Sequence, residues 1–265
     1  MTGSRSSPDL AGRAYWDGIW HRAGHGGAGQ LSFFYQAFKR VLDRYVGPGT
    51  TACEVGCADS IWVPYLIRRG AEVTGLDYSE AGMRRLQESL STLGLSATLL
   101  GRDLLSEDPF GGRQFDVVYS LGLVEHFERG NGIVAALARA LRPGGILITV
   151  VPNLAGTWGA LQRRLDRHVF DLHVVYRPAE LDQIHAAAGL EPVAQAEYFG
   201  VFGPLIMHRP SFAQHHPLLN RGVMAVLWGL QQSVAWAASL VLRSAADSRR
   251  FSSHIVGVYR REKAA

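Results

Sequence analysis

TACEVGCADS, at residues 51–60, is the stretch that decides how this chain folds. It reads as a short apolar strand that ends near Glu54, followed by a turn of small residues from Gly56 to Ser60 that opens an apolar helix over residues 61–67. Small residues in such a turn let backbone N–H groups approach a ligand closely. The stretch therefore predicts a strand, a turn and a helix, with a ligand site at the turn.

A second apolar run, VTGLDYSE at residues 73–80, stops at the carboxylate of Asp77. An acid roughly twenty residues after the turn is typical of the ribose-binding residue in a nucleotide-binding βαβ unit. Of the glycines in the G-x-G-x-x-G fingerprint, however, only Gly56 is present. These residues alone leave two interpretations open, a nucleotide site and a βαβ unit without a ligand.

The composition is that of an α/β protein with one sizeable core. The chain of 265 residues is 47% hydrophobic, which fits one elaborated domain better than two. Its 27 basic and 23 acidic residues give a net charge of +4, and the basic residues form no dense run, so we expect no nucleic-acid partner. The polar N-terminus contains no apolar signal segment, and we expect a cytoplasmic location.

The sequence predicts no metal site. Cys53 and Cys57 form a C-x3-C pair without further cysteines or a matching histidine cluster, and they read as small apolar fillers in a reducing compartment. His208, His215 and His216 lie close together late in the chain, but no carboxylate accompanies them. We expect these histidines to lie on a loop surface.

Two segments precede the predicted core. Residues 1–12 are rich in Ser, Gly and Pro and predict a disordered tail. Residues 13–46 predict a helical lid, because Tyr15, Trp16 and Trp20 fall on one helical face before a glycine-rich loop. This face either covers a bound ligand or simply packs on the sheet, and the sequence leaves both interpretations open.

A repeating β-α pattern follows over residues 47–200. Five repeats of this kind argue for a Rossmann-like, doubly wound sheet of seven mostly parallel strands with right-handed crossovers. One helix is predicted to run through Leu141 and to end at the following Arg-Pro-Gly-Gly segment. After the first two strands, further strands are predicted at residues 97–100, 115–120, 146–151, 193–199 and 253–259.

Five motifs in this region resemble those of class I S-adenosylmethionine-dependent methyltransferases, particularly the small-molecule group called type 11. They are, in order, ACEVGCADS, VTGLDYSE, GRDLL, FDVVYSLGLVEHF and ALRPGGILITVVPN, and they cover about residues 50–200. The chain departs from the family in the first motif, where E/D-x-G-x-G-x-G is usual and Glu54-x-Gly56-x-Ala58-x-Ser60 stands here. Ala and Ser are small enough to keep the turn.

The resemblance implies S-adenosylmethionine as the cofactor and S-adenosylhomocysteine as its product. It places the methionine part along the turn and near the backbone of Ser120, the ribose on Asp77, and the adenine beside Tyr78 and Asp103, with Leu104 next to Asp103. If the N-terminal segment is a lid, its aromatic residues contact the same ligand. The cofactor-binding residues that we predict are Tyr15, Trp20, Glu54, Gly56, Cys57, Asp77, Tyr78, Asp103, Leu104 and Ser120.

The acceptor side offers few proton acceptors. Methyl transfer from a sulfonium is an in-line displacement in which alignment and exclusion of water supply much of the acceleration, so a base is needed only where the acceptor loses a proton. The predicted catalytic residues are Glu125 and His126, which follow the strand at residues 115–120, and His173, in a segment that lies over the acceptor in the family. A purely structural role for these residues stays open.

Residues 201–252 predict a helical insertion or cap before the last strand and tail at residues 253–265. The uncharged run at residues 222–242 is long enough to span a membrane, but Gln231 and Gln232 lie in its middle. We therefore expect no stable membrane span. Peripheral membrane contact, a wall for a lipophilic acceptor and a homodimer interface stay open.

These observations predict an enzyme that methylates a small molecule. A hydroxyl oxygen of a natural-product-like or lipophilic compound is the first choice of acceptor, because histidines accompany an apolar insertion. Transfer to nitrogen or carbon is one alternative. A non-catalytic regulatory protein that binds S-adenosylmethionine is the other, and turnover of the donor distinguishes it from an enzyme.

Overall fold

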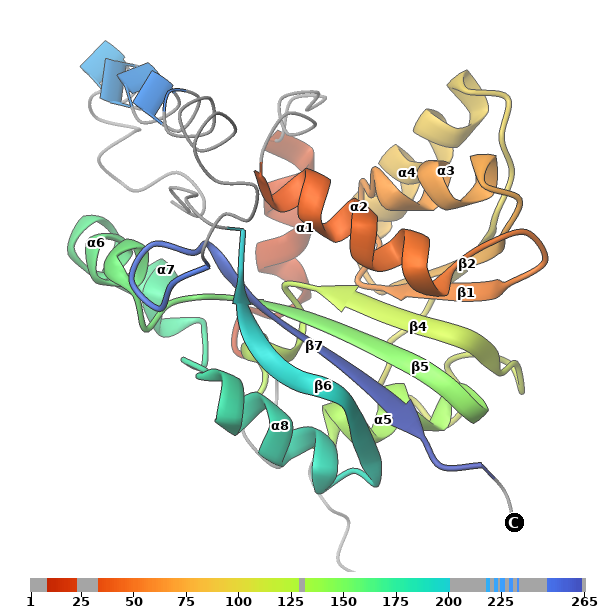
Figure 1. The fold of residues 1–265 in the computed structure, drawn as a ribbon. Helices are drawn as coiled ribbons and strands as arrows, with labels where there is room; N and C mark the ends of the chain where they lie inside the picture. Colours follow the sequence, from red (N-terminus) through yellow and green to blue (C-terminus); the bar gives the residue numbers. More distant parts are fainter. Residues whose placement is uncertain are drawn as a thin grey trace, which may run out of the picture.

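The computed structural model describes residues 9–22, 33–128, 132–200 and 247–263, together with single positions between 218 and 233. It shows a twisted sheet with helices on both faces (Figure 1). Residues 1–8 and most of the expected insertion at residues 201–252 lie outside the described residues. The predictions for these two segments therefore stay predictions.

The sheet has seven strands in the order β3-β2-β1-β4-β5-β7-β6. Neighbouring strands from β3 to β5 pair in parallel, whereas β7 pairs antiparallel with both β5 and β6. The predicted Rossmann-like, mostly parallel sheet is therefore confirmed. The strands are β1 (Thr51–Val55), β2 (Glu72–Asp77), β3 (Thr98–Gly101), β4 (Phe115–Leu121), β5 (Leu141–Pro152), β6 (Leu190–Phe199) and β7 (His254–Arg261).

Helices cover both faces of the sheet (Figure 1). Val117 of β4 belongs to a hydrophobic cluster with α2, α3 and α4, while its neighbour Val118 belongs to a second cluster with α5 and α8. Since side chains alternate along a strand, β4 is apolar on both faces because both are covered. The helices are α1 (Arg13–Arg22), α2 (Phe33–Tyr45), α3 (Trp62–Arg68), α4 (Glu80–Thr92), η1 (Val124–His126), α5 (Ile133–Arg139), α6 (Thr157–Leu165), α7 (Arg167–Asp171) and α8 (Pro178–Ala186).

Two helix starts follow the signals in the sequence. Ser79 precedes α4, and its hydroxyl accepts a hydrogen bond of 3.2 Å from the backbone N–H of Gly82. Pro178 is the first residue of α8, where its missing N–H costs nothing, and the Glu180 carboxylate accepts a hydrogen bond of 2.8 Å from the backbone N–H of Arg177. Both helices therefore begin where the sequence carries a start signal.

One helix ends earlier than the sequence predicts. Helix α5 ends at Arg139, and Leu141 already pairs with Phe115 as the first residue of β5. The prediction that this helix runs through Leu141 is wrong. The backbone N–H of Phe115 donates a hydrogen bond of 2.8 Å to the carbonyl of Ala140, so pairing with β4 draws the chain into the sheet. Helical periodicity does not reveal such a pairing.

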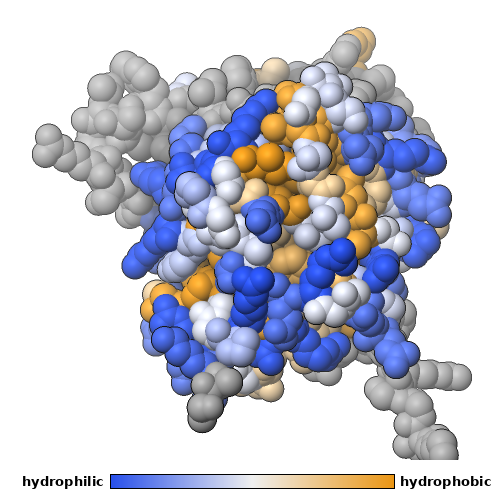
Figure 2. Space-filling model, turned by 90° about the vertical axis from the view of Figure 1, so that its right-hand side faces the viewer, coloured by the Kyte–Doolittle hydropathy of each residue, from blue (hydrophilic) through white to orange (hydrophobic). Residues whose placement is uncertain are grey.

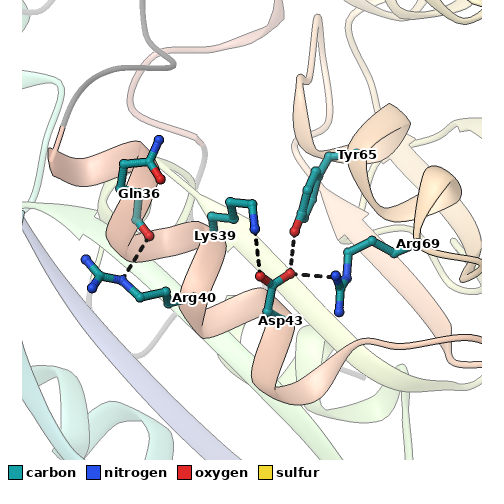
Figure 3. Close-up of polar contacts among 6 residues, drawn as sticks. All are labelled: Gln36, Lys39, Arg40, Asp43, Tyr65 and Arg69. Carbon is teal, nitrogen blue, oxygen red and sulfur yellow. Dashed lines mark hydrogen bonds and ion pairs between the residues drawn. The ribbon is translucent and has the colours of Figure 1, made fainter.

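A polar cluster around Asp43 joins α2 to α3 (Figure 3). The Asp43 carboxylate accepts hydrogen bonds from the Lys39 ammonium at 2.8 Å and from the Tyr65 hydroxyl. Nε of Arg69, just after α3, lies 3.1 Å from the same carboxylate. Exposed ion pairs contribute about 0–1 kcal/mol each. The buried apolar side chains of α2 therefore supply most of the attachment, and the cluster orients the helix.

The face on the side of α3 and α4 has hydrophobic residues in its centre, framed by hydrophilic ones (Figure 2). Roughly 55–60% of the accessible surface of folded proteins is apolar, so this distribution alone implies no partner.

Across the described ranges, none of the helices is both long enough and apolar enough to cross a bilayer.

Candidate functional site

A cavity of about 400 Å³ opens where the parallel strands end. Its wall includes the last residues of four strands, which are Val55, Asp77, Leu121 and Pro152. Ligands of open α/β sheets bind at this edge, and cavities of a few hundred Å³ suit small molecules. The cavity therefore lies at the edge where the sequence analysis places the ligand.

The turn after β1 is held tightly between β2 and α4. Gly56 has a φ of +80°, a conformation that other residues rarely adopt, and its N–H donates a hydrogen bond of 2.8 Å to the carbonyl of Leu76. A Cβ added to Gly82 would lie only 2.2 Å from the Cβ of Ala58. Ala58 can therefore stand where the family usually has glycine because the helix opposite supplies a glycine.

Asp77 keeps acceptor capacity for a ligand. Its Oδ1 accepts a hydrogen bond of 2.7 Å from the backbone N–H of Ser79, and its Oδ2 accepts one of 3.1 Å from that of Ala58. A carboxylate has about four acceptor positions, so about two remain for the hydroxyls of a ribose. Burial raises the pKa of Asp77, although the two backbone hydrogen bonds favour the charged form. The residue thus fits a nucleoside ligand.

Glu54 lines the cavity and connects the turn to the sheet. Its Oε2 accepts hydrogen bonds from the hydroxyls of Ser60 at 2.5 Å and Tyr119 at 2.9 Å. The Ser60 oxygen in turn accepts a hydrogen bond of 3.0 Å from the backbone N–H of Trp62, at the start of α3. Burial raises the pKa of Glu54 to about 7 because desolvation outweighs the two hydrogen bonds. Ser60, in the place of the family's last glycine, therefore links the acid to the helix.

Tyr78, Asp103 and Leu104 line the same cavity after β2 and β3. The Tyr78 hydroxyl donates a hydrogen bond to the carboxylate of Asp9, and burial raises the pKa of Tyr78 above its usual range. Oδ1 of Asp103 accepts a hydrogen bond of 2.9 Å from the backbone N–H of Leu105. The structure brings together the three residues predicted to hold the adenine, and it adds Asp9, which the sequence analysis assigned to a disordered tail.

Helix α1 forms one side of the cavity. Trp16 and Trp20 line it with their rings stacked 6.5 Å apart, whereas Tyr15 meets Trp16 edge-on at 5.3 Å and is not part of the wall. Oδ1 of Asp17 accepts a hydrogen bond of 2.5 Å from the Ser79 hydroxyl, which ties α1 to the start of α4. The helix thus packs on the core and lines the cavity at once. Its closure over a ligand stays a prediction.

The three predicted catalytic residues meet in the wall of this cavity. Glu125, His126 and His173 are 1%, 3% and 8% exposed, and one ligand atom from each lies within 4.8 Å of the other two. The backbone N–H of Val174 donates a hydrogen bond of 2.6 Å to the carbonyl of Glu125, which holds the two segments side by side. Burial raises the pKa of Glu125 to about 8.

Backbone carbonyls orient both imidazoles of this cluster. Nδ1 of His126 lies 3.0 Å from the carbonyl oxygen of Leu172, and Nδ1 of His173 lies 2.7 Å from that of Val169. A carbonyl oxygen only accepts hydrogen bonds, so each Nδ1 carries a proton and, in the neutral ring, each Nε2 carries the lone pair. The cluster therefore combines one carboxylate with two basic nitrogens.

Two further predicted residues do not line the cavity. Ser120 is buried within β4, while its neighbours Leu121 and Gly122 belong to the wall. Sγ of Cys57 lies 3.7 Å from the sulfur of Met83, behind the turn. Both residues are therefore part of the support of the site.

His254 and Phe34 line the cavity but were not predicted. Their rings lie 4.1 Å apart, and antiparallel pairing places His254 opposite Pro152 at the end of β5. Burial lowers the pKa of His254 to about 3. The register between strands so far apart in the chain cannot be read from either strand alone, so no local signal announces this histidine.

Known proteins with similar sequences are methyltransferases. Residues 53–149 match a family model described as "Methyltransferase domain". A ubiquinone biosynthesis O-methyltransferase of Pseudomonas paraeruginosa is 33% identical over 153 residues, and the match spans 54% of this chain and 65% of that protein. A ubiquinone biosynthesis O-methyltransferase of Pseudomonas fluorescens is 30% identical over 160 residues, with 56% of this chain and 68% of that protein covered. The chain thus spans about two thirds of the length of these relatives.

Solved structures share the fold at low identity. A [4+2]-cyclase superposes with a TM-score of 0.63 at 14% identity and covers 99% of this chain and 100% of its own. A magnesium protoporphyrin IX methyltransferase from Synechocystis PCC 6803, solved with bound SAH, has a TM-score of 0.53 at 16% identity and covers 96% of this chain and 94% of its own. Such likeness establishes the fold alone. Because the two names describe different chemistry, function has to be argued from the site.

Proposed function

This chain belongs to the class I S-adenosylmethionine-dependent methyltransferases, and from that premise we propose that it transfers the methyl group to a hydroxyl oxygen of a small molecule. One observation carries the proposal, namely that a single cavity holds both Asp77 and the cluster of Glu125, His126 and His173. Asp77 suits a nucleoside donor, and the cluster suits an acceptor that loses a proton. The printed names of the relatives, O-methyltransferases, support oxygen as the acceptor atom.

The donor half of the cavity binds S-adenosylmethionine through an acidic side chain and through a backbone turn that approaches the ligand closely. The free acceptor positions of Asp77 receive the ribose hydroxyls, and Tyr78, Asp103 and Leu104 surround the adenine. The turn at Gly56 brings its backbone to the methionine part. When bound, S-adenosylmethionine supplies a methyl group on a positively charged sulfur, which leaves as a neutral thioether when a nucleophile attacks that carbon.

The acceptor half of the cavity takes up a proton. A neutral imidazole accepts a proton near neutral pH, and His126 and His173 both have Nδ1 bonded to a carbonyl, so Nε2 is the accepting atom. The ring of Trp16 meets that of His126 edge-on at 4.8 Å and so fixes its position. Shielding by α1 keeps water from the reacting atoms, which favours transfer to the acceptor over hydrolysis.

Purified full-length protein tests this function in two steps. S-adenosylhomocysteine should bind with one equivalent in calorimetry. Incubation with S-adenosylmethionine and a panel of hydroxylated, amino and carbon-acid compounds should then give S-adenosylhomocysteine and a product heavier by one CH₂ group, bound at oxygen. Replacing His168, an exposed histidine of α7, by asparagine should change neither step and serves as the control.

Three outcomes would contradict the proposal. A protein that does not bind S-adenosylhomocysteine lacks the proposed donor site. Binding without turnover of any acceptor in the panel favours the non-catalytic alternative, since the fold, which a [4+2]-cyclase shares, does not by itself impose methyl transfer. A methyl group on nitrogen or carbon contradicts the assignment to oxygen.

A further inference from the structure

We propose that Glu125, His126 and His173 form a binding site for a divalent transition-metal ion, such as zinc, manganese or iron(II). Two imidazole nitrogens and one carboxylate oxygen are the ligands that these ions prefer, whereas magnesium and calcium prefer oxygen alone. The cysteines and the late histidines of the sequence predict no metal site. The histidine and carboxylate ligands proposed here lie on two segments that only the fold brings together.

A bound ion would supply a partner for the buried carboxylate of Glu125. The side chain is almost completely buried, and within the ranges that the structure describes its Oε2 has no hydrogen-bond partner. An unsatisfied buried carboxylate oxygen is costly, and such groups in proteins usually have a hydrogen bond or coordinate a metal. Oε1 of the same carboxylate lies 4.0 Å from Nε2 of His126. A cation between these side chains would balance the buried charge.

Both imidazoles are oriented as metal-binding histidines usually are. A histidine ligand commonly donates its other ring N–H to a backbone carbonyl, which fixes the tautomer and directs the remaining nitrogen at the ion. His126 and His173 both make this contact, with the carbonyls of Leu172 and Val169. The hydrogen bond from Val174 to the Glu125 carbonyl adds a constraint on the third ligand. The supporting contacts of a metal site are therefore already present.

The distances require only a small contraction. Bonds of about 2.0–2.2 Å to nitrogen and oxygen place neighbouring ligand atoms of a tetrahedral ion roughly 3.3 Å apart. Oε1 of Glu125 and Nε2 of His126 are 4.0 Å apart, and the three ligand atoms lie within 4.8 Å of one another, so side-chain rotations have to close gaps of up to about 1.5 Å. Three protein ligands leave at least one position of the ion open. Since all three residues line the cavity, that position would face the space in which the proposed acceptor binds.

This placement defines the acceptor chemistry, and that part of the inference rests on the proposed function. With the lone pairs of both Nε2 atoms bound to the ion, the imidazoles no longer accept the proton. A hydroxyl oxygen bound to a divalent cation is more acidic than a free one, so its proton passes to solvent near neutral pH. The oxygen then forms a bond to the methyl carbon, and the carbon–sulfur bond breaks with its electron pair left on sulfur. The preferred acceptors are therefore hydroxyl compounds that coordinate a metal ion.

Calorimetric titration with Co²⁺ tests the site directly. The full-length protein, freed of any histidine tag and treated with a chelator, should bind one equivalent with saturation. Glu125→Gln keeps the shape and removes the charge, while His173→Asn keeps an N–H for the carbonyl of Val169 and removes the ligand nitrogen. Each should weaken Co²⁺ binding at least tenfold, by analogy with the losses known for altered metal sites. His168→Asn should bind Co²⁺ like the parent protein.

Affinity for S-adenosylhomocysteine, measured in the same samples, shows whether each variant has kept its fold. No saturable Co²⁺ binding by the parent protein overturns the proposal. Equal Co²⁺ affinity of the parent and both folded variants overturns it as well, because the ion then binds elsewhere.

A pH profile of methyl transfer separates this inference from the proposed function. Once an acceptor is found, the acidic limb of the profile should lie at lower pH in the Co²⁺-loaded enzyme than in the chelator-treated enzyme. Identical profiles would overturn the role of the ion at the hydroxyl, whereas methyl transfer by both forms would still support the proposed function. Metal binding without any methyl transfer would count against the proposed function and leave the metal site in place.

Discussion

Replacing Glu54 by glutamine should stabilise the ligand-free protein at pH 8 and change its stability much less at pH 5. Burial raises the pKa of Glu54 from 4.5 to about 7, although the hydroxyls of Ser60 and Tyr119 both donate hydrogen bonds to it. The amide oxygen of glutamine can accept both hydrogen bonds without carrying a charge. The variant therefore keeps the contacts of Glu54 and removes its ionisation.

The pKa of Glu54 sets the size and the sign of this effect. A carboxyl whose pKa is raised on folding contributes stability that is complete below its unfolded pKa of 4.5 and is lost as the pH rises through about 7. At about 1.4 kcal/mol per pKa unit, the whole contribution is about 3 kcal/mol. Most of it is lost between pH 5 and pH 8. The advantage of the glutamine variant should therefore grow by about 2–3 kcal/mol over that interval.

Urea unfolding of parent and variant at both pH values measures this change as a shift of the midpoint at constant slope. Glu80→Gln is the matched control, because Glu80 is exposed in the first turn of α4. It should alter the free energy of unfolding by less than about 0.5 kcal/mol at either pH. If the difference in the free energy of unfolding between the Glu54 variant and the parent is the same at pH 5 and pH 8, the raised pKa of Glu54 is refuted.

Three further substitutions test the donor site and its support. Asp77→Ala should weaken S-adenosylhomocysteine binding by about 1.5–3 kcal/mol in a folded variant, and an unchanged calorimetric affinity would contradict the ribose assignment. Asp17→Ala removes the hydrogen bond to Ser79, so proteolysis of α1 should be faster than in the parent, and equal cleavage rates would show that apolar packing alone holds the helix. Gly82→Ala presses a methyl group against Ala58 and should lower the free energy of unfolding by about 1–2 kcal/mol in urea, whereas a neutral result would mean that the turn can shift.

The sequence predicts the central strands of the sheet because they are buried on both faces. The run around Val118 is continuously apolar, and in a protein of this length such a run signals a strand with helices on either side. The prediction is wrong at Leu141, where the apolar spacing of a helix continues although the residue pairs with Phe115. Periodicity describes which residues are buried. It does not say which partner buries them.

The residues of the site also divide into those that the sequence predicts and those that it does not. Asp77 could be named from the sequence because parallel strands bring their carboxyl ends to one edge, so an acid at such an end has a predictable place, whereas Asp103 was named through the resemblance to the methyltransferase motifs. His254 and Asp9 could not be named, because their positions depend on an antiparallel register and on the packing of the N-terminal segment. Neither feature leaves a pattern in the local sequence.

The departures from the family's first motif do not favour a protein that has lost its ligand. Ala58 fits its tight position because Gly82 faces it, and Ser60 bonds both to Glu54 and to the backbone at the start of α3. In each case a specific partner elsewhere in the chain matches the substituted residue. A turn that had merely lost its glycines would have no reason to keep such partners, and Asp77 would have no reason to keep open acceptor positions in the wall of a cavity. The structure of the turn is therefore an argument for retained donor binding.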